Sequence, residues 1–166
     1  GSEWSFFGTM TLVGLGNGDL NDEKALEDAA KLVQKYKNEF SEGTPLVCAC
    51  EKGRLEDVRV LVEGHDVEKT GMSVDEMVSK EGKKSNGSSR TPLHSAAEKE
   101  QFEIAQYLVK SCTTVDLIGQ TNSGGYNSLH YAASDSKKNV QTLQFLIDSY
   151  NGDIKEIINE KNEDEY

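Results

Sequence analysis

Two cysteines separated by a single residue are the first candidates for chemistry, because a C-x-C pair can bind a metal ion. Cys48 and Cys50 lie in a stretch of helical character, where positions two apart point about 200° away from each other and cannot share one ion. With Cys112 the chain has 3 cysteines, and an odd count does not make a self-contained set of disulfides. Free thiols fit a reducing compartment. We interpret all three as small packed residues and expect an intracellular, cytoplasmic protein without a metal site.

A glycine-rich run, Gly14-Leu15-Gly16-Asn17-Gly18, is the next candidate, because such loops can cradle phosphate. The dinucleotide fingerprint G-x-G-x-x-G needs a final glycine where this chain has Asp19, a carboxylate where a phosphate would sit. Helical repeats follow at once and leave no room for a βαβ unit. We interpret the run as a flexible turn and expect no cofactor.

The histidines complete the search for catalytic groups. His94 and His130 each follow an apolar motif about one repeat apart, and His65 lies in a turn. This spacing suggests no set of nucleophile, base and orienting group. We therefore expect a protein that is not an enzyme.

Charge narrows the choice of partners. The chain has 166 residues with 29 Asp+Glu against 18 Lys+Arg, a net charge of −11. Phosphate contacts need Lys or Arg, so we expect neither nucleic acid nor an anionic membrane surface as a partner. No stretch approaches the ~18–20 apolar residues of a membrane-spanning helix. The acidic run 148–166 is either a solvated face or a surface that attracts a basic partner.

Three similar segments position these residues. Thr44-Pro45-Leu46, Thr91-Pro92-Leu93 and Asn127-Ser128-Leu129 each start an apolar run with small residues, and each is followed by a second apolar stretch. Thr or Asn before such a run is a helix N-cap, and Pro at the first helical position loses no bonded N–H. The second stretches carry apolar residues at spacings of three and four, which is typical of amphipathic helices. Each unit is predicted to be a helix–turn–helix.

These motifs resemble the ankyrin repeat family, whose T-P-L-H-x-A pattern recurs about every 33 residues. The resemblance implies an all-α ankyrin-repeat solenoid of helix–turn–helix repeats joined by β-turn fingers, with the motif histidines bonding the Thr hydroxyl and backbone. It divides the chain into an N-terminal extension with a degenerate capping repeat (1–43), a repeat with an insertion (44–90), a second repeat (91–126), and a third that ends in the finger of a further repeat (127–166). We therefore expect a piece of a longer array.

Four departures from the family pattern give local predictions. Residues 22–37 are predicted to be the outer helix of the capping repeat, with its inner helix from residues 5–18. Glu100 stands where an inter-helix glycine is expected, and the turn around 136–138 has two extra residues. The longest departure is an insertion at about 72–89. There Ser73 and Glu76 form a capping box for a short helix at about 74–80, and a polar tract follows that we expect to remain unpacked.

The family resemblance implies a protein–protein interaction module whose partner docks on a concave face of fingers and inner helices. The alternative is a regulatory domain of a larger enzyme or channel. The insertion is either a neutral surface loop or part of the recognition surface. We expect a monomer, or weak self-association through exposed end repeats. The predicted contact residues are Glu68, Lys69, Met77, Ser95, Glu98, Ile118, Gln120, Thr121, Asn122, Tyr131 and Ser134.

Overall fold

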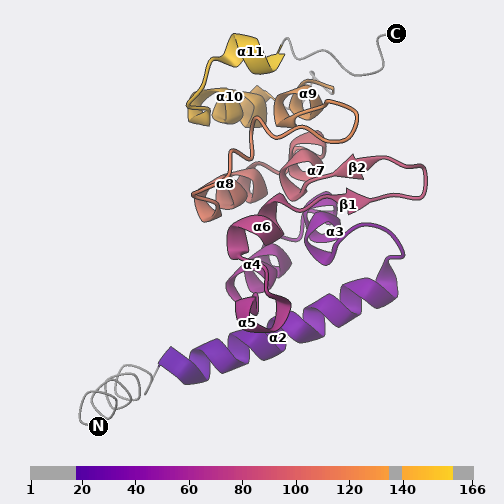
Figure 1. Cartoon of the computed structure of the whole chain (residues 1–166), viewed down its shortest axis with the longest axis vertical. Helices are drawn as coiled ribbons and strands as arrows, with labels where there is room; N and C mark the ends of the chain where they lie inside the picture. The colour runs from indigo at the N-terminus through magenta and orange to yellow at the C-terminus, as the bar shows by residue number, and fades with distance from the viewer. Residues whose placement is uncertain (1–17, 135–139, 159–166) are drawn as a thin grey trace.

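The chain is a stack of helix pairs in the computed structural model, which describes residues 18–134 and 140–158, with side chains from residue 22 onward. Figure 1 shows the stack with α2 at one end and α11 at the other. This confirms the predicted all-α solenoid. The elements are α2 (Gly18–Glu39), α3 (Pro45–Lys52), α4 (Leu55–Glu63), α5 (Val67–Thr70), α6 (Val74–Ser79), β1 (Gly82–Lys83), β2 (Ser89–Arg90), α7 (Pro92–Glu98), α8 (Phe102–Ser111), α9 (Ser128–Ala133), α10 (Val140–Ser149) and α11 (Ile154–Ile158).

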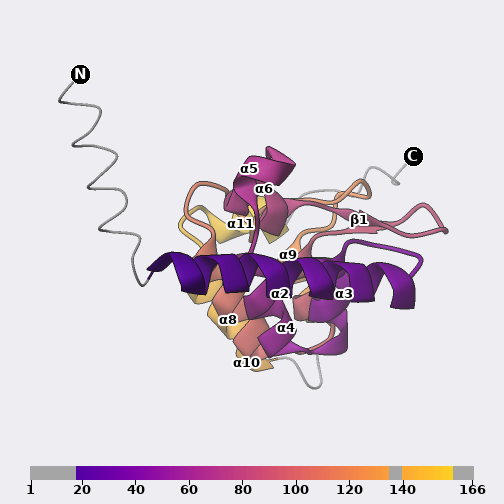
Figure 2. The ribbon, with the colours of Figure 1, turned by 90° about the horizontal axis from the view of Figure 1, so that it is seen from below.

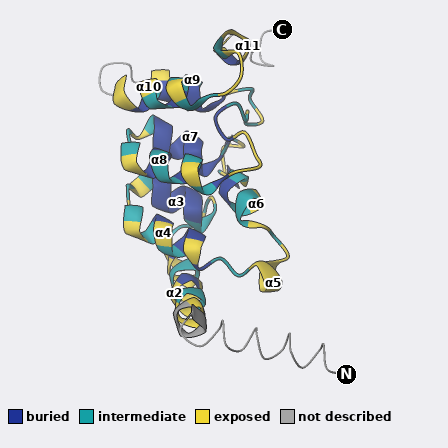
Figure 3. Cartoon of the chain, turned by 90° about the vertical axis from the view of Figure 1, so that its left-hand side faces the viewer, coloured by how far each residue is buried: buried dark blue, intermediate teal, exposed yellow. Residues whose placement is uncertain are grey.

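Three helix pairs form the body of the stack: α3 with α4, α7 with α8, and α9 with α10. The first members, α3, α7 and α9, pack on one another in a row and are called the inner helices. The second members, α4, α8 and α10, form the outer row (Figure 3). Buried residues concentrate where the two rows meet, so the core runs through the stack.

Each inner helix starts at the predicted residue. Thr44, Thr91 and Asn127 each accept a hydrogen bond from the backbone N–H three residues later, at 3.2 Å in every case. Pro45 and Pro92 occupy the first turn, where the absent N–H leaves no helical bond unmade. The N-cap predictions are therefore confirmed for all three repeats.

The inter-helix turn needs a left-handed residue. Gly53 fills this position in the first repeat with φ of 70°, and Glu100 fills it in the second with φ of 60°. A side chain in this conformation costs about 1–2 kcal/mol. The turn at Glu100 therefore has the same backbone conformation as the glycine turn, although the residue differs from the family pattern. The packed helices α7 and α8 on either side hold Glu100 in this conformation. The extra residues predicted around 136–138 lie outside the described residues.

The core of the second repeat shows why neighbouring repeats depend on each other. Leu93 on α7 and Leu108 on α8 are completely buried. Ala96 and Ala97 are also completely buried and let the neighbouring helices approach α7 closely. Each repeat therefore covers its apolar surface with the next one, and stability is shared between neighbours.

We expect Leu93→Ala to lower the free energy of unfolding by ~2–5 kcal/mol, because it leaves a cavity where a completely buried side chain was. Denaturant titration of both proteins measures the difference. A loss below ~1 kcal/mol would contradict the assignment of Leu93 to the shared core.

Helix α2 covers one end of the stack. The predicted helix at 22–37 is confirmed and extends to Gly18–Glu39. It packs along α4 and also contacts α3. The buried Tyr36 donates its hydroxyl hydrogen to Asp57 on α4 at 2.7 Å. A Cβ atom at Gly64 would lie 2.1 Å from the carbonyl oxygen of Ala25, so this contact requires glycine. The predicted inner helix at 5–18 falls outside the described residues apart from Gly18.

The polar tract predicted to remain unpacked forms a finger instead, which corrects the insertion boundary. Strands β1 and β2 pair antiparallel, Gly82 with Arg90 and Lys83 with Ser89. The amide of Lys84 bonds the Ser88 carbonyl at 2.8 Å to close the turn. This hairpin, residues 82–90, is the regular finger between the first two repeats. The additional structure in this repeat is the helix pair α5–α6, in which α6 precedes β1 directly and α5 lies farther down the stack, at the level of α2 (Figure 1).

Helix α6 begins with the predicted capping box. The Glu76 amide donates to Ser73 Oγ at 3.1 Å, and the Ser73 amide donates to a Glu76 carboxylate oxygen at 2.8 Å. Val78 is completely buried, and α6 contacts α4, α7 and α8. Gln120 in the next repeat donates from its side-chain nitrogen to the Ser79 carbonyl at 2.9 Å. The inserted helix is therefore part of the core between two repeats.

This burial leads us to expect Val78→Ala to lower the free energy of unfolding by about 2 kcal/mol, since two buried methyl groups are removed and a void remains. The matched control is Val67→Ala on α5, where the side chain is 46% exposed and the loss should stay below about 0.5 kcal/mol. Equal effects of the two variants in denaturant titration would show that α6 does not contribute to the core.

His94 connects its inner helix to the following finger. The Thr91 amide donates to His94 Nδ1 at 3.2 Å, and His94 Nε2 lies 2.9 Å from the carbonyl oxygen of Gln120. Nδ1 accepts and Nε2 donates, so the ring is a neutral tautomer. The imidazole makes hydrogen bonds with backbone groups, as the resemblance implied. The Thr91 hydroxyl accepts a hydrogen bond from the backbone amide of His94 and not from its ring. Complete burial of the ring lowers its pKa to about 4, and the charge of Arg90 acts in the same direction.

Because an unfolded His has a pKa near 6.5, the unfolded chain takes up a proton before the folded one does. The stability contributed by neutral His94 is present above about pH 6.5 and is lost as pH falls toward 4. Titration of the His94 ring proton by NMR should show a midpoint near 4. A midpoint near 6.5 would contradict a buried, neutral ring.

Candidate partner-binding surface

The residues that could perform chemistry are packed rather than grouped. Cys48, Cys50 and Cys112 are free and buried, and burial raises the pKa of each thiol, which disfavours the reactive thiolate. This confirms their interpretation as packed residues. In residues 18–134 and 140–158 no cluster of three or more His, Cys, Asp or Glu side chains has an arrangement that could hold a metal ion.

Fingers and inner helices meet along one side of the stack. Figure 2 shows the finger strand β1 and helix α3 on this side. A second finger, residues 119–126, has the same turn, closed by the Asn122 amide on the Tyr126 carbonyl at 2.9 Å. Asn122 also donates from its side chain to the Ser89 carbonyl at 3.0 Å. The two fingers are therefore held side by side.

A guanidinium group lies at the junction of the first finger with α7 and α9. Arg90 is ion-paired with Glu98, and its guanidinium carbon lies 5.0 Å from the ring centre of Tyr131. The hydroxyl of Tyr131 accepts a hydrogen bond from the Asn122 side chain at 2.9 Å. Burial raises the pKa of Tyr131, so the phenol is neutral. These contacts hold two large side chains rigidly at a partly exposed surface.

Aromatic rings extend this junction toward the second finger. Tyr126 lies 5.9 Å from the ring of His130, edge to face, and 6.2 Å from that of Tyr131. The Tyr126 side chain is among the most exposed large apolar side chains in the described residues, at 38%. We call the set Arg90, Glu98, Asn122, Tyr126 and Tyr131 the Tyr126 surface.

Three of the predicted contact residues, Glu98, Asn122 and Tyr131, come together in the Tyr126 surface. Thr121 and Ser134 are exposed, on the second finger and at the end of α9. Gln120 is half-buried and bonded to Ser79, so its side chain connects two repeats.

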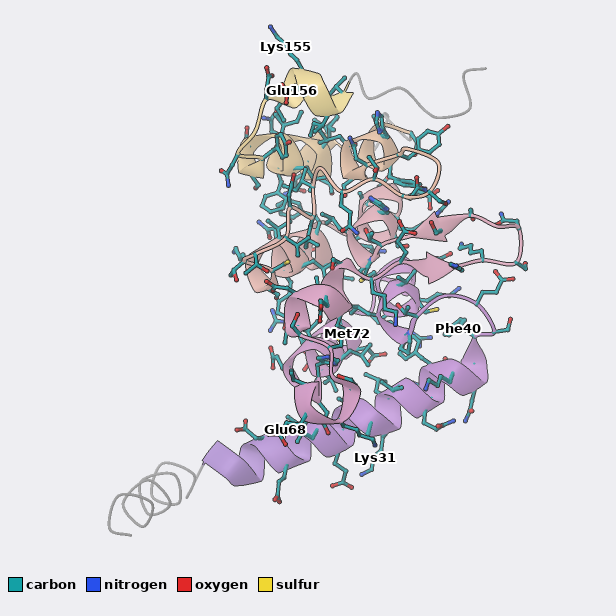
Figure 4. The ribbon with its side chains drawn as sticks, viewed as in Figure 1. Lys31, Phe40, Glu68, Met72, Lys155 and Glu156 are labelled. Carbon is teal, nitrogen blue, oxygen red and sulfur yellow. The ribbon has the colours of Figure 1, made fainter. Side chains whose placement is uncertain are left out.

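Five predicted contact residues lie elsewhere. Ser95 and Ile118 are buried in the stack, at 0% and 4% exposure, because the family positions they occupy face the neighbouring repeat here. Glu68 and Lys69 are exposed on α5, so they belong to the insertion and not to a finger. Figure 4 shows Glu68 at the α2 end of the stack, away from Phe40 at the finger side. Met77 on α6 packs against the core. None of the five contributes to the Tyr126 surface.

Two members of the Tyr126 surface were missed from the sequence. Arg90 and Tyr126 each stand directly before an N-cap residue, Thr91 or Asn127, in successive repeats. The sequence does carry one signal that could have identified them. Both residues directly precede a buried N-cap residue, and residues at equivalent positions of successive repeats lie on the same face of the stack. Their mutual contact through Tyr131 depends on how the repeats stack.

A shallow recess adjoins the first finger. It has a volume of about 270 Å³ and is lined by Phe40, Cys48, Glu51, Lys52 and Lys84 among others. Lys84 and Glu51 lie 3.6 Å apart across it, and Lys52 sits over the Phe40 ring. The side of the molecule with the fingers therefore carries charges of both signs with aromatic rings between them.

Comparison with known proteins agrees with this geometry. A family model for ankyrin repeats, comprising three copies, matches residues 71–158, more than half of the chain. A search of curated proteins gave no match. Among the described helices none is long and apolar enough to cross a bilayer. The fold agrees with this match, since it consists of capped inner helices, paired outer helices and intervening fingers. The chain therefore belongs to the ankyrin repeat family, whose repeats are generally protein–protein interaction modules.

Proposed function

We propose that the chain binds a protein partner through the Tyr126 surface, between the fingers and the inner helices. The observation that carries the proposal is the contact of Arg90 with both Glu98 and Tyr131, beside the exposed Tyr126. Tyr and Arg are the residue types enriched among residues that dominate binding energy. Here the cluster is already fixed by its own hydrogen bonds, so less side-chain entropy is lost on binding.

The exposed Thr121 and Ser134 extend this surface at its margin. The alternative is that the chain is a regulatory domain and that the contacted segment belongs to a larger enzyme or channel containing it. The same surface serves both functions, and the full-length open reading frame separates them.

Three further properties belong to the proposal. The chain acts as a non-enzymatic module, in line with its family, and needs no cofactor. It works inside the cell, where its three free cysteines stay reduced. Its net charge of −11 opposes binding to nucleic acid, and it is a monomer or associates weakly through its end repeats.

Partner capture tests the proposal. The chain is immobilised, incubated with lysate, and the retained proteins are identified by mass spectrometry. Removing Tyr126 and Glu98 together (Tyr126→Ala with Glu98→Ala) should weaken binding of the identified partner at least tenfold, because a central aromatic and the ion pair of Arg90 are lost.

The control variant carries Glu56→Ala with Val67→Ala, two exposed positions on α4 and α5. It should bind as the unmodified chain does. Melting temperatures of both variants within a few degrees of the parent show that the fold is intact. Unchanged affinity of the Tyr126 and Glu98 variant would overturn the proposal.

A further inference from the structure

The gap between the outer ends of the first two repeats is filled by the inserted segment. His65, just after α4, contacts the Met72 carbonyl oxygen through Nε2 at 2.8 Å. Asp75 accepts hydrogen bonds from the Thr114 amide at 2.9 Å and from the Thr114 hydroxyl, just after α8. Figure 1 shows α6 between α4 and α8. The ends of two neighbouring outer helices thus hold one short segment between them.

The corresponding gap between the second and third repeats is open. A recess of about 390 Å³ lies there, lined by Val109, Cys112, Leu117 and Ile118 from one repeat and by Tyr150 and Gly152 from the next. The outer helices align at Leu61, Leu108 and Leu146, which are 47 and 38 residues apart. In this alignment Cys112 takes the place of His65, and Gly152 that of Thr114. The recess is therefore the counterpart of the filled gap.

Backbone donors in the recess match those that hold Asp75. Thr113 and Thr114 donate their amides to the Asp75 carboxylate. Their counterparts are Asn151 and Gly152, whose amides make no hydrogen bond to any described residue and whose residues are exposed. A segment entering the recess can accept hydrogen bonds from both amides.

The charge of the recess favours one kind of segment. Asp116 is the only charged side chain among its described lining residues. One carboxylate oxygen of Asp116 accepts from the amides of Ile118 at 3.1 Å and Gly119 at 3.0 Å, and the residue forms no ion pair with a described cation. A basic group beside the recess can pair with this exposed carboxylate.

We propose that this recess binds a short segment of a partner protein that inserts one apolar side chain and carries a Lys or Arg next to it. The apolar side chain packs against Val109, Leu117 and Tyr150, as Val78 packs in the preceding gap. The basic residue pairs with Asp116, and backbone carbonyls of the segment accept from the amides of Asn151 and Gly152. This site is separate from the Tyr126 surface and does not depend on it.

The probe is a phage-displayed library of random 12-residue peptides selected on the whole chain. Enriched peptides are synthesised, and their affinities are measured by fluorescence anisotropy. Val115→Trp places a bulky ring at the edge of the recess and should weaken binding at least tenfold. Its matched control is Val67→Trp, a similarly exposed valine (46% against 37%) on α5, which should leave the affinity unchanged. Asp116→Asn keeps the accepting oxygen, removes the charge, and should weaken binding severalfold with a smaller salt dependence.

The site is supported if the enriched peptides carry an apolar residue beside Lys or Arg, and if Val115→Trp and Asp116→Asn both weaken their binding. The melting temperature of Val115→Trp checks its fold, and Asp116→Asn alone decides the outcome if that variant does not fold. The inference is overturned if no peptide is enriched. It is also overturned if the enriched peptides lose affinity with Tyr126→Ala and not with the recess variants, a result that would leave the proposed function standing.

Discussion

A single helix pair of this chain has more apolar surface than it can bury by itself, and this constraint shapes the molecule. Leu93 and Leu108 are completely buried only because α3 and α9 lie on either side of α7. The small side chains of Ala96 and Ala97 let those helices come close enough to exclude water. Each repeat is therefore stable as part of a row, and the ends of the row need covers. Helix α2 provides one of them through Ala29 and Tyr36.

Stacking also decides where recognition can occur. Because the repeats stand in register, residues at equivalent positions line up along one side of the stack. Arg90 from the first finger, Tyr131 from α9 and Tyr126 from the second finger become neighbours in this way. His94 bonds α7 to the second finger through the Gln120 carbonyl, and Asn122 bonds the second finger to the first through the Ser89 carbonyl, so the cluster has a rigid support. In the proposed function, a partner meets side chains that are already ordered, which reduces the entropy lost on association.

The insertion shows how the same stack accommodates an irregular segment. Helices α5 and α6 leave the finger and the inner helices in place, and α6 occupies a gap between the ends of α4 and α8. One buried side chain, Val78, and one carboxylate, Asp75, hold α6 in place. This gap is filled between the first two repeats, and the equivalent gap between the next two is an open recess. The recess is a second surface of the chain, separate from the Tyr126 surface.

Much of the fold follows from the sequence alone, because its causes are local. Thr44, Thr91 and Asn127 cap helices through bonds to residues three positions away, and Ser73 with Glu76 does the same for α6. Such signals act within one turn of chain and can be recognised as patterns. The repeated motifs that begin at Thr44, Thr91 and Asn127 then indicated the family and, with it, the order of inner and outer helices.

Contacts between repeats were decided only by the tertiary structure. The polar tract after α6 was expected to remain unpacked, yet it forms the finger of residues 82–90, because Gly82 lies against the backbone of Gly43 and Thr44 far back in the chain. Ser95 and Ile118 read as surface residues from their repeat positions but are buried by the adjacent repeat. The Tyr126 surface likewise combines residues up to 41 positions apart, from Arg90 to Tyr131. Local patterns specify helices and caps, whereas burial and the meeting of side chains depend on how closely one repeat approaches the next.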